Sequence, residues 1–247
     1  MTAFELEICC FNYVSCLIAE QAGATRIELC ADAAEGGTTP GYGTIRMVKE
    51  KTGIPVYPII RPRGGDFLYG DDEYAIMQKE VRVCKELGCE GVVIGLLNAD
   101  GSVDKKRTAS LVELAYPMGV TFHRAFDRAA NPFEALATII QTGCERILTS
   151  GQRPLAADAI PLLDELVRNA DGQVVIMPGS GIRAANIGLL AGKTGAREFH
   201  SSARIPAKSK MEFTPAHMNE SLTTLLADAA EIAGMVKQLQ SHFSAIS

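Results

Sequence analysis

The sequence predicts an α/β protein of the (β/α)8 class, the TIM barrel, in which eight parallel strands close into a ring inside a layer of helices. Three observations lead to this prediction. Short apolar runs typical of buried strands alternate with longer segments of helical periodicity. One turn pattern, a glycine that ends a helix followed within a few residues by an apolar run, recurs along the chain. Finally, eight such units fit into about 200 residues, as is usual for this class.

The recurring turn places four of the strands. It occurs in QAGATRIEL (21–29), ELGCEGVVI (86–94), QTGCERILT (141–149) and KTGAREFHS (193–201), where Gly23, Gly88, Gly143 and Gly195 suit a left-handed helix end. The other four strands are expected at FELEIC (4–9), VYPIIR (56–61), VTFHRA (120–125) and VVIMPG (174–179). Helices are expected at 13–22, 43–52, 71–87, 104–115, 132–142, 155–169 and 183–192.

Strict alternation of strands and helices favours parallel strands joined by right-handed crossovers. An open doubly wound sheet is the alternative. The first strand is not followed by G-x-G-x-x-G, so the sequence gives no support to a dinucleotide-binding fold.

The last part of the chain does not follow the repeat. Residues 203–220 read as a long loop, and residues 221–240 have the apolar spacing of a closing helix. A loop of this length is usually functional or mobile. We expect a single domain over residues 1–247, with the barrel at 4–203 and the C-terminal loop and helix at 204–247.

Composition argues against several classes of function. The net charge is −5 and there is no basic block, so nucleic acid is not an expected partner. No positively charged leader and no membrane-length apolar run are found, so we expect a cytoplasmic protein with no membrane partner. The seven cysteines lack C-x-x-C spacing, which argues against a disulfide scaffold and a zinc knuckle. We expect Cys16, Cys84, Cys89 and Cys144 to be buried as small apolar residues. Cys10 follows Cys9 on the same strand and should therefore face the helices.

Polar residues collect near the carboxyl ends of the predicted strands, although barrel strands are normally almost continuous in Val, Ile and Leu. LEIC (6–9) and IELC (27–30) each put a glutamate and a cysteine on one face of a strand. In this fold the carboxyl ends of the strands build the active site, so these groups should converge there. The alternative is a set of ion pairs that satisfy one another without any chemistry.

The polar groups permit acid–base chemistry and anion binding. Glu7 and Glu28, beside arginines, should stay ionised and could act with His123 as catalytic bases. Arginines can bind a carboxylate or phosphate, and turns after the last strands of such barrels often bind phosphate. The candidate anion-binding residues are Arg61, Arg63, Arg124, Ser150, Gly179, Gly181 and Ser201. No lysine ends a strand, so Schiff-base chemistry lacks its nucleophile.

The thiols permit a metal site. Neighbouring strands lie roughly 4.8 Å apart, so Cys9 and Cys30 could bring their sulfurs together. Thiolates select Cu(I), and His123 or His200 could assist as a further ligand. The alternative reading of both cysteines is core packing. A hard divalent ion between Glu7 and Glu28 would lack a third carboxylate.

Several motifs resemble one family. IELCA (27–31), EGGTTP (35–40), IIRPRGGDFLY (59–69), TFHRAFD (121–127), RILTSGQ (146–152) and EFHSSA (198–203) are similar to the CutC family of copper homeostasis proteins. The resemblance covers about residues 4–203 and implies a cytoplasmic TIM barrel, often a homodimer or larger assembly. It also implies Cu(I) binding by Cys9 and Cys30. At 211–214 the chain departs from the family's pattern, in which a basic residue tends to follow the aromatic one.

Three hypotheses follow from the sequence. The first is a copper homeostasis protein that binds Cu(I) through Cys9 and Cys30. The second is an enzyme that acts on a small phosphorylated or carboxylated metabolite, with indirect effects on copper. The third is a catalytically silent barrel that assembles as an oligomer through its C-terminal segment.

Overall fold

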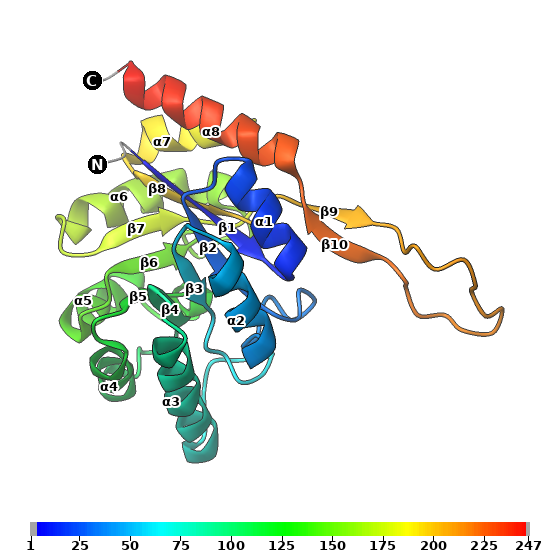
Figure 1. The fold of residues 1–247 in the computed structure, drawn as a ribbon. Coiled ribbons are helices and arrows are strands. Elements are labelled where there is room, and N and C mark those ends of the chain that lie inside the picture. The colour runs from blue at the N-terminus through cyan, green and yellow to red at the C-terminus, as the bar shows by residue number, and fades with distance from the viewer. Residues whose placement is uncertain (1–3, 246–247) are drawn as a thin grey trace.

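The computed structural model describes residues 4–245, and in it eight central strands lie inside a layer of helices (Figure 1). The strands of the barrel are β1 (Glu5–Cys10), β2 (Arg26–Leu29), β3 (Val56–Pro58), β4 (Gly91–Ile94), β5 (Gly119–Phe122), β6 (Arg146–Thr149), β7 (Val175–Pro178) and β8 (Glu198–Ser201). The helices are α1 (Tyr13–Gln21), α2 (Tyr42–Lys51), α3 (Asp71–Glu86), α4 (Lys105–Ala115), α5 (Pro132–Thr142), α6 (Ile160–Ala170), α7 (Ile187–Thr194) and α8 (Ala229–Ser244). Short 3-10 helices lie at η1 (Arg124–Arg128) and η2 (Ala156–Ala159).

All ladders between the barrel strands are parallel. The strands form two four-stranded sheets, one in the order β3-β2-β1-β8 and the other in the order β4-β5-β6-β7. A parallel bridge between Ile59 and Val93 joins them, and the Ile60 amide donates to the Val93 carbonyl at 2.8 Å. On the other side β7 lies beside β8. The predicted (β/α)8 class is therefore confirmed.

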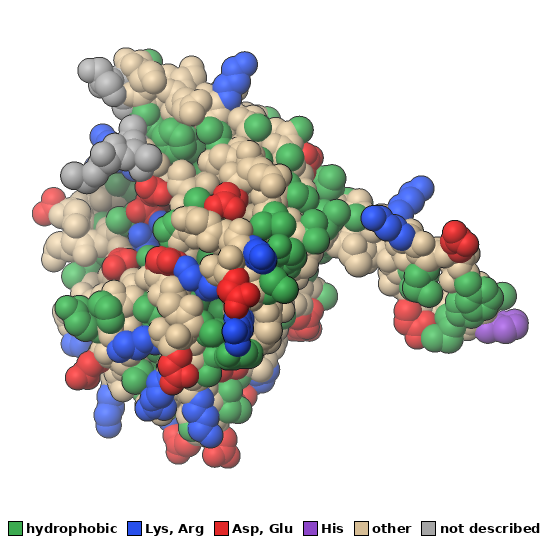
Figure 2. Space-filling model, in the orientation of Figure 1, with side chains coloured by type: hydrophobic (Ala, Val, Ile, Leu, Met, Phe, Trp, Pro, Cys, Tyr) green, Lys and Arg blue, Asp and Glu red, His purple; other side chains and the backbone are tan. Residues whose placement is uncertain are grey.

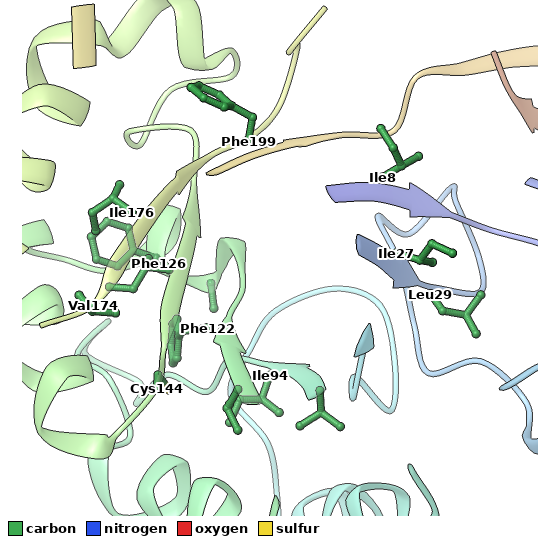
Figure 3. Packing of buried hydrophobic residues seen from close by; sticks show 14 of the residues in the cluster. Ile8, Ile27, Leu29, Ile94, Phe122, Phe126, Cys144, Val174, Ile176 and Phe199 are labelled. Carbon is green, nitrogen blue, oxygen red and sulfur yellow. The ribbon is translucent and has the colours of Figure 1, made fainter. Parts of the chain in front are cut away.

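The strands separate two interiors of different character. Side chains that point outward, such as Ile8, Ile27 and Phe122, pack with the helices in the main apolar core (Figure 3). Cys10 belongs to this outer core, as predicted from its position next to Cys9. Inside the ring a small apolar cluster is found instead, composed of Cys9, Cys30, Tyr57, Ile59 and Val93. Much of the remaining barrel interior is polar, with Leu148 and Met177 as buried apolar exceptions.

The C-terminal segment differs from the prediction. Instead of an irregular loop at 203–220 and a helix at 221–240, β9 (Arg204–Ala207) and β10 (Thr224–Ala227) pair antiparallel. We call residues 204–227 the hairpin arm; it extends away from the barrel (Figure 1). The apolar run in SLTTLLA fits either periodicity, and pairing with β9 makes it a strand. The helix starts only at Ala229, where Asp228 caps it.

Other boundaries move by a few residues. The strand expected at 120–125 ends at Phe122, because η1 follows and the Ala125 amide donates to His123 Nδ1 at 3.1 Å. The helix expected at 183–192 begins at Ile187. The four glycines of the recurring turn have φ between 69° and 96°, as the turn pattern predicts. Among residues 4–245 no helix is both long and apolar enough to cross a bilayer.

Candidate functional site

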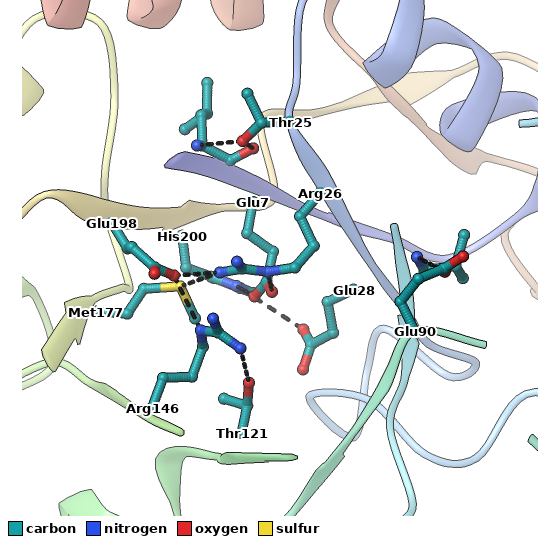
Figure 4. Close-up of polar contacts among 12 residues, drawn as sticks. Glu7, Thr25, Arg26, Glu28, Glu90, Thr121, Arg146, Met177, Glu198 and His200 are labelled. Carbon is teal, nitrogen blue, oxygen red and sulfur yellow. Dashed lines mark hydrogen bonds and ion pairs between the residues drawn. The ribbon is translucent and has the colours of Figure 1, made fainter. Parts of the chain in front are cut away.

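A network of buried charges fills the amino-terminal end of the barrel interior (Figure 4). The Arg26 guanidinium contacts Glu7 Oε2 at 2.6 Å and Glu198 Oε2 at 2.7 Å. Arg146 reaches the same Glu198 oxygen at 2.9 Å. The two guanidinium groups lie 5.3 and 5.4 Å from the centre of the Tyr57 ring. These contacts compensate the charges, so this layer supports the barrel.

Glu7 links this network to His200. Its second oxygen, Oε1, lies 2.7 Å from His200 Nδ1. Burial alone would raise the pKa of Glu7, but Arg26 and His200 together lower it to about 2. The carboxylate is therefore ionised, as predicted, but both of its oxygens are occupied. This geometry suits a residue that positions His200, and it suits a catalytic base less well.

The two thiols of the repeated E-x-C pattern lie together. Cys9 Sγ and Cys30 Sγ are 3.6 Å apart, and both side chains are buried. The Cys30 hydrogen bond, aided by His200, lowers the pKa of the Cys9 thiol to about 5 against the opposing effect of burial. Burial and the hydrogen bond with Cys9 raise the pKa of Cys30. One thiol of the pair thus has thiolate character, which is the form that binds metals.

Glu28 and His200 complete this cluster. One carboxyl oxygen of Glu28 lies within 4.8 Å of both sulfurs. Glu28 Oε2 also lies 3.7 Å from His200 Nε2. Burial, followed by the charge of Cys9, raises the pKa of Glu28 well above its usual range, which runs against the expectation that Glu28 stays ionised. Burial opposes the charged form of His200, but hydrogen bonds with Cys9 and Glu7 raise its pKa.

A cavity of about 340 Å³ opens above the thiols at the carboxyl end of the barrel. Of the predicted residues, it is lined by Cys9, Glu28, Arg61, His123, Arg124, Gly181, His200 and Ser201. The structure thus brings eight of the predicted residues together around one cavity.

His123 is a neutral imidazole in the wall of this cavity. Burial, with the nearby Arg61 charge, lowers the pKa of His123 to about 3. Nδ1 accepts the Ala125 amide hydrogen, so the ring proton resides on Nε2. Nε2 is buried and has no hydrogen-bond partner among the described residues. His123 therefore presents a donor, and its low pKa makes it a poor base.

The arginines predicted to bind anions have different surroundings. Arg61 is buried and donates to the carbonyls of Glu35, Gly37 and Gly65, so it ties two loops together, while its Nε has no partner. Arg63 does not line the cavity; it contacts Glu73 at 2.5 Å and Asp66 at 2.9 Å.

The remaining predicted residues mostly shape loops. Ser150 is buried, its hydroxyl donates to Asp127 Oδ2 at 2.9 Å, and it lies outside the cavity lining. Gly179 lies where a Cβ would come within 2.4 Å of Leu148, so it has a packing role. The Ser201 hydroxyl donates to the Ile182 carbonyl at 2.8 Å, which joins the turns after β7 and β8.

The sequence reasoning missed four arginines of the barrel. Arg26 and Arg146 start β2 and β6, and the R-x-E spacing of Arg26 and Glu28 could have signalled that Arg26 also faces inward. Arg183 and Arg204 line the cavity from the turn after β7 and from the hairpin arm. No pattern in the sequence signals these two, because neither lies on a barrel strand.

Comparisons with known proteins place the chain among its relatives. The model of the CutC family matches residues 4–205. A family protein CutC from Parabacteroides distasonis is 52% identical over 209 residues, which cover 84% of this chain and 86% of the relative. The human copper homeostasis protein cutC homolog is 45% identical over 210 residues, covering 85% and 77% of the two chains.

Solved structures agree with this relationship. A structure of CutC from Streptococcus agalactiae has a TM-score of 0.77 and 30% identity, and the match covers 81% of this chain and 98% of that one. The N-(5'-phosphoribosyl)anthranilate isomerase from Pyrococcus furiosus has a TM-score of 0.58 at 12% identity, with 96% and 99% coverage. The second likeness concerns the fold alone.

Proposed function

The chain belongs to the CutC family, and we propose that it acts in copper homeostasis by binding Cu(I) through Cys9 and Cys30. Relatives at 45% and 46% identity are named copper homeostasis protein cutC homologs. The observation that carries the proposal is the pair of buried sulfurs 3.6 Å apart at the mouth of the barrel. Soft thiolates favour Cu(I) over hard ions.

The distance between the sulfurs fits a single metal ion. A metal–thiolate bond of about 2.3 Å, the zinc value, is more than half of the sulfur–sulfur separation. One ion could therefore contact both Cys9 and Cys30 in a bent arrangement, which leaves room for a third ligand. In the proposal this ligand is His200, since imidazole suits copper better than the carboxylate of Glu28 does.

Glu7 supports His200 in this role. Its carboxylate holds Nδ1 at 2.7 Å, which leaves Nε2 on the side of Glu28. A carboxylate behind a ligating histidine fixes the orientation of the ring and increases its basicity. Arg26 in turn holds Glu7. The inner charge network would thus keep the proposed copper ligands in position.

Titration with Cu(I) under anaerobic conditions, in competition with a chromogenic chelator, tests the proposal. We expect Cys9→Ser and Cys30→Ser each to abolish high-affinity binding. Cys10→Ser is the matched control, because Cys10 adjoins Cys9, is 1% exposed and packs against the helices. Equal affinity in the wild type and in both Cys9 and Cys30 variants would refute the assignment.

The proposal includes a reducing, cytoplasmic location. All seven cysteines are free thiols, including the close pair Cys9 and Cys30. Such thiols persist where glutathione and thioredoxin keep proteins reduced. Cell fractionation with an antibody to the chain would check the location, and recovery in the soluble cytoplasmic fraction is expected.

We also propose that the chain forms a homodimer through the hairpin arm, with residues 1–247 as one domain. Apolar side chains gather on the arm (Figure 2), among them Met211, Phe213 and Met218, which are 64%, 72% and 57% exposed. Large apolar side chains exposed together on an extended arm favour burial in an interface with another subunit. Sedimentation should show a dimer that becomes a monomer in Met211→Ser/Phe213→Ser but not in the control Leu189→Ser, on α7. A monomeric wild type would refute this.

A further inference from the structure

The proposed copper site does not account for the whole cavity lining. Besides Cys9, Glu28 and His200, the lining includes His123, Arg61 and Phe67. A site for a single Cu(I) ion needs neither a neutral histidine donor nor several arginines. These residues call for a separate explanation.

Two buried donors in this wall have no partner. His123 is 4% exposed and Arg61 5% exposed, and neither His123 Nε2 nor Arg61 Nε has a hydrogen-bond acceptor among the described residues. Buried donors are rarely left without an acceptor, since each then loses its hydrogen bonds to water without replacement. Both residues line the same cavity. An acceptor oxygen of a bound molecule would satisfy them.

The orientation of His123 is fixed by its neighbours. The Ala125 amide donates to Nδ1, so Nε2 carries the hydrogen. The ring also packs on Phe67 at 4.9 Å between centroids. The Nδ1–Cε1 edge of the ring lies against Gly95, where a Cβ atom would come within 2.3 Å of it. The absence of a side chain at Gly95 therefore makes room for the ring. The donor is therefore held in place before any ligand arrives.

The rim of the cavity is positively charged. Arg183 and Arg204 have exposed side chains, and neither forms an ion pair within the described part of the chain. Arg204 stacks on Phe11, and Arg124 contacts Asp127 at 2.7 Å while still lining the cavity. Glu28 is the sole acidic residue of the cavity lining among residues 4–245. This distribution favours an anion.

We infer that the mouth of the barrel binds a small organic anion, a carboxylate or a phosphate monoester. Its acceptor oxygen takes the hydrogens of His123 Nε2 and Arg61 Nε, and its charged group lies beside Arg183 and Arg204. The cavity of about 340 Å³ is at the small end of the range for ligand pockets, which suits a metabolite and excludes a folded partner. This inference goes beyond copper binding and does not depend on it.

Calorimetric titration of copper-free protein with inorganic phosphate, and separately with malonate, tests the inference. We expect saturable binding of at least one anion, weakened about tenfold in Arg183→Ala through loss of one charge-assisted hydrogen bond. Arg168→Ala is the matched control, because this exposed arginine lies on α6 and pairs with Asp164. The anion that binds more tightly identifies the charged group of the ligand.

A second readout follows His123 in the wild-type protein, so it does not depend on a variant that folds poorly. In spectra of isotope-labelled histidine, the Nε2 signal of His123 should shift as the anion binds, while the ring nitrogen signals of exposed His217 should not. Absence of saturable binding by both anions would overturn the inference. So would equal affinities in Arg183→Ala and Arg168→Ala, or a His123 signal that does not move.

Discussion

Replacing Arg26 with methionine should destabilise the barrel strongly. The Arg26 side chain is 6% exposed and contacts Glu7, 0% exposed, and Glu198, 14% exposed. Breaking a buried ion pair from one side typically costs about 3–5 kcal/mol, because the remaining charge stays buried. Glu198 keeps Arg146, and Glu7 keeps His200. We therefore expect a loss near the lower limit, about 3 kcal/mol of unfolding free energy.

Urea unfolding followed by circular dichroism at neutral pH measures this loss. Arg46→Met is the matched control, since Arg46 pairs with Glu50 at 2.8 Å on the solvent-exposed face of α2 and its removal should leave stability unchanged. The double variant Arg26→Met/Glu7→Gln should recover part of the loss, because glutamine removes the buried negative charge that Arg26 no longer compensates. If Arg26→Met lost less than about 1 kcal/mol, the same as a typical exposed pair, the reasoning would be wrong.

Two further predictions concern the barrel interior. The pKa of His123 falls from 6.5 to about 3 on folding, so below pH 6.5 the unfolded state takes up a proton that the folded state does not. As the pH falls from 6.5 to 4.5, the unfolding free energy of the wild type should therefore decrease more steeply than that of His123→Phe, by about 1.4 kcal/mol per pH unit. This range lies above the pH at which Glu7 titrates. Parallel pH profiles of the two proteins in urea unfolding would contradict this. Gly91→Ala should cost about 1–3 kcal/mol, because its Cβ would lie 2.1 Å from the Tyr57 ring. Gly43→Ala in α2, where nothing lies within 4 Å, should instead stabilise the chain, and similar melting temperatures for the two variants would refute the packing argument.

Strand periodicity explains why much of the site could be predicted from sequence. Successive side chains on a strand alternate between faces, so the position of Glu7 also fixes that of Cys9, and Glu28 does the same for Cys30. The closed ring brings these positions together with His123 and turns Cys10 outward. Fold class and thiol proximity follow from this rule, and so do the positions of Cys9, Glu28 and His200 in the cavity lining.

The errors fall where that rule does not apply. Arg63 lies beyond the end of β3, and local contacts with Glu73 and Asp66 turn it away from the cavity. The hairpin arm depends on pairing between β9 and β10, whose apolar residues have no unambiguous period. The pKa of Glu28 depends on burial and on the charge of Cys9. Such effects arise from tertiary surroundings and leave no local signal.

The central claim is that sulfurs from two neighbouring strands, assisted by His200, form one copper site. X-ray absorption at the copper edge of the Cu(I)-loaded protein tests it most directly. The account predicts two sulfur ligands and one nitrogen ligand, with the nitrogen lost in His200→Ala and one sulfur lost in Cys30→Ser. A copper spectrum with no sulfur ligand, or one unchanged in both variants, would contradict it.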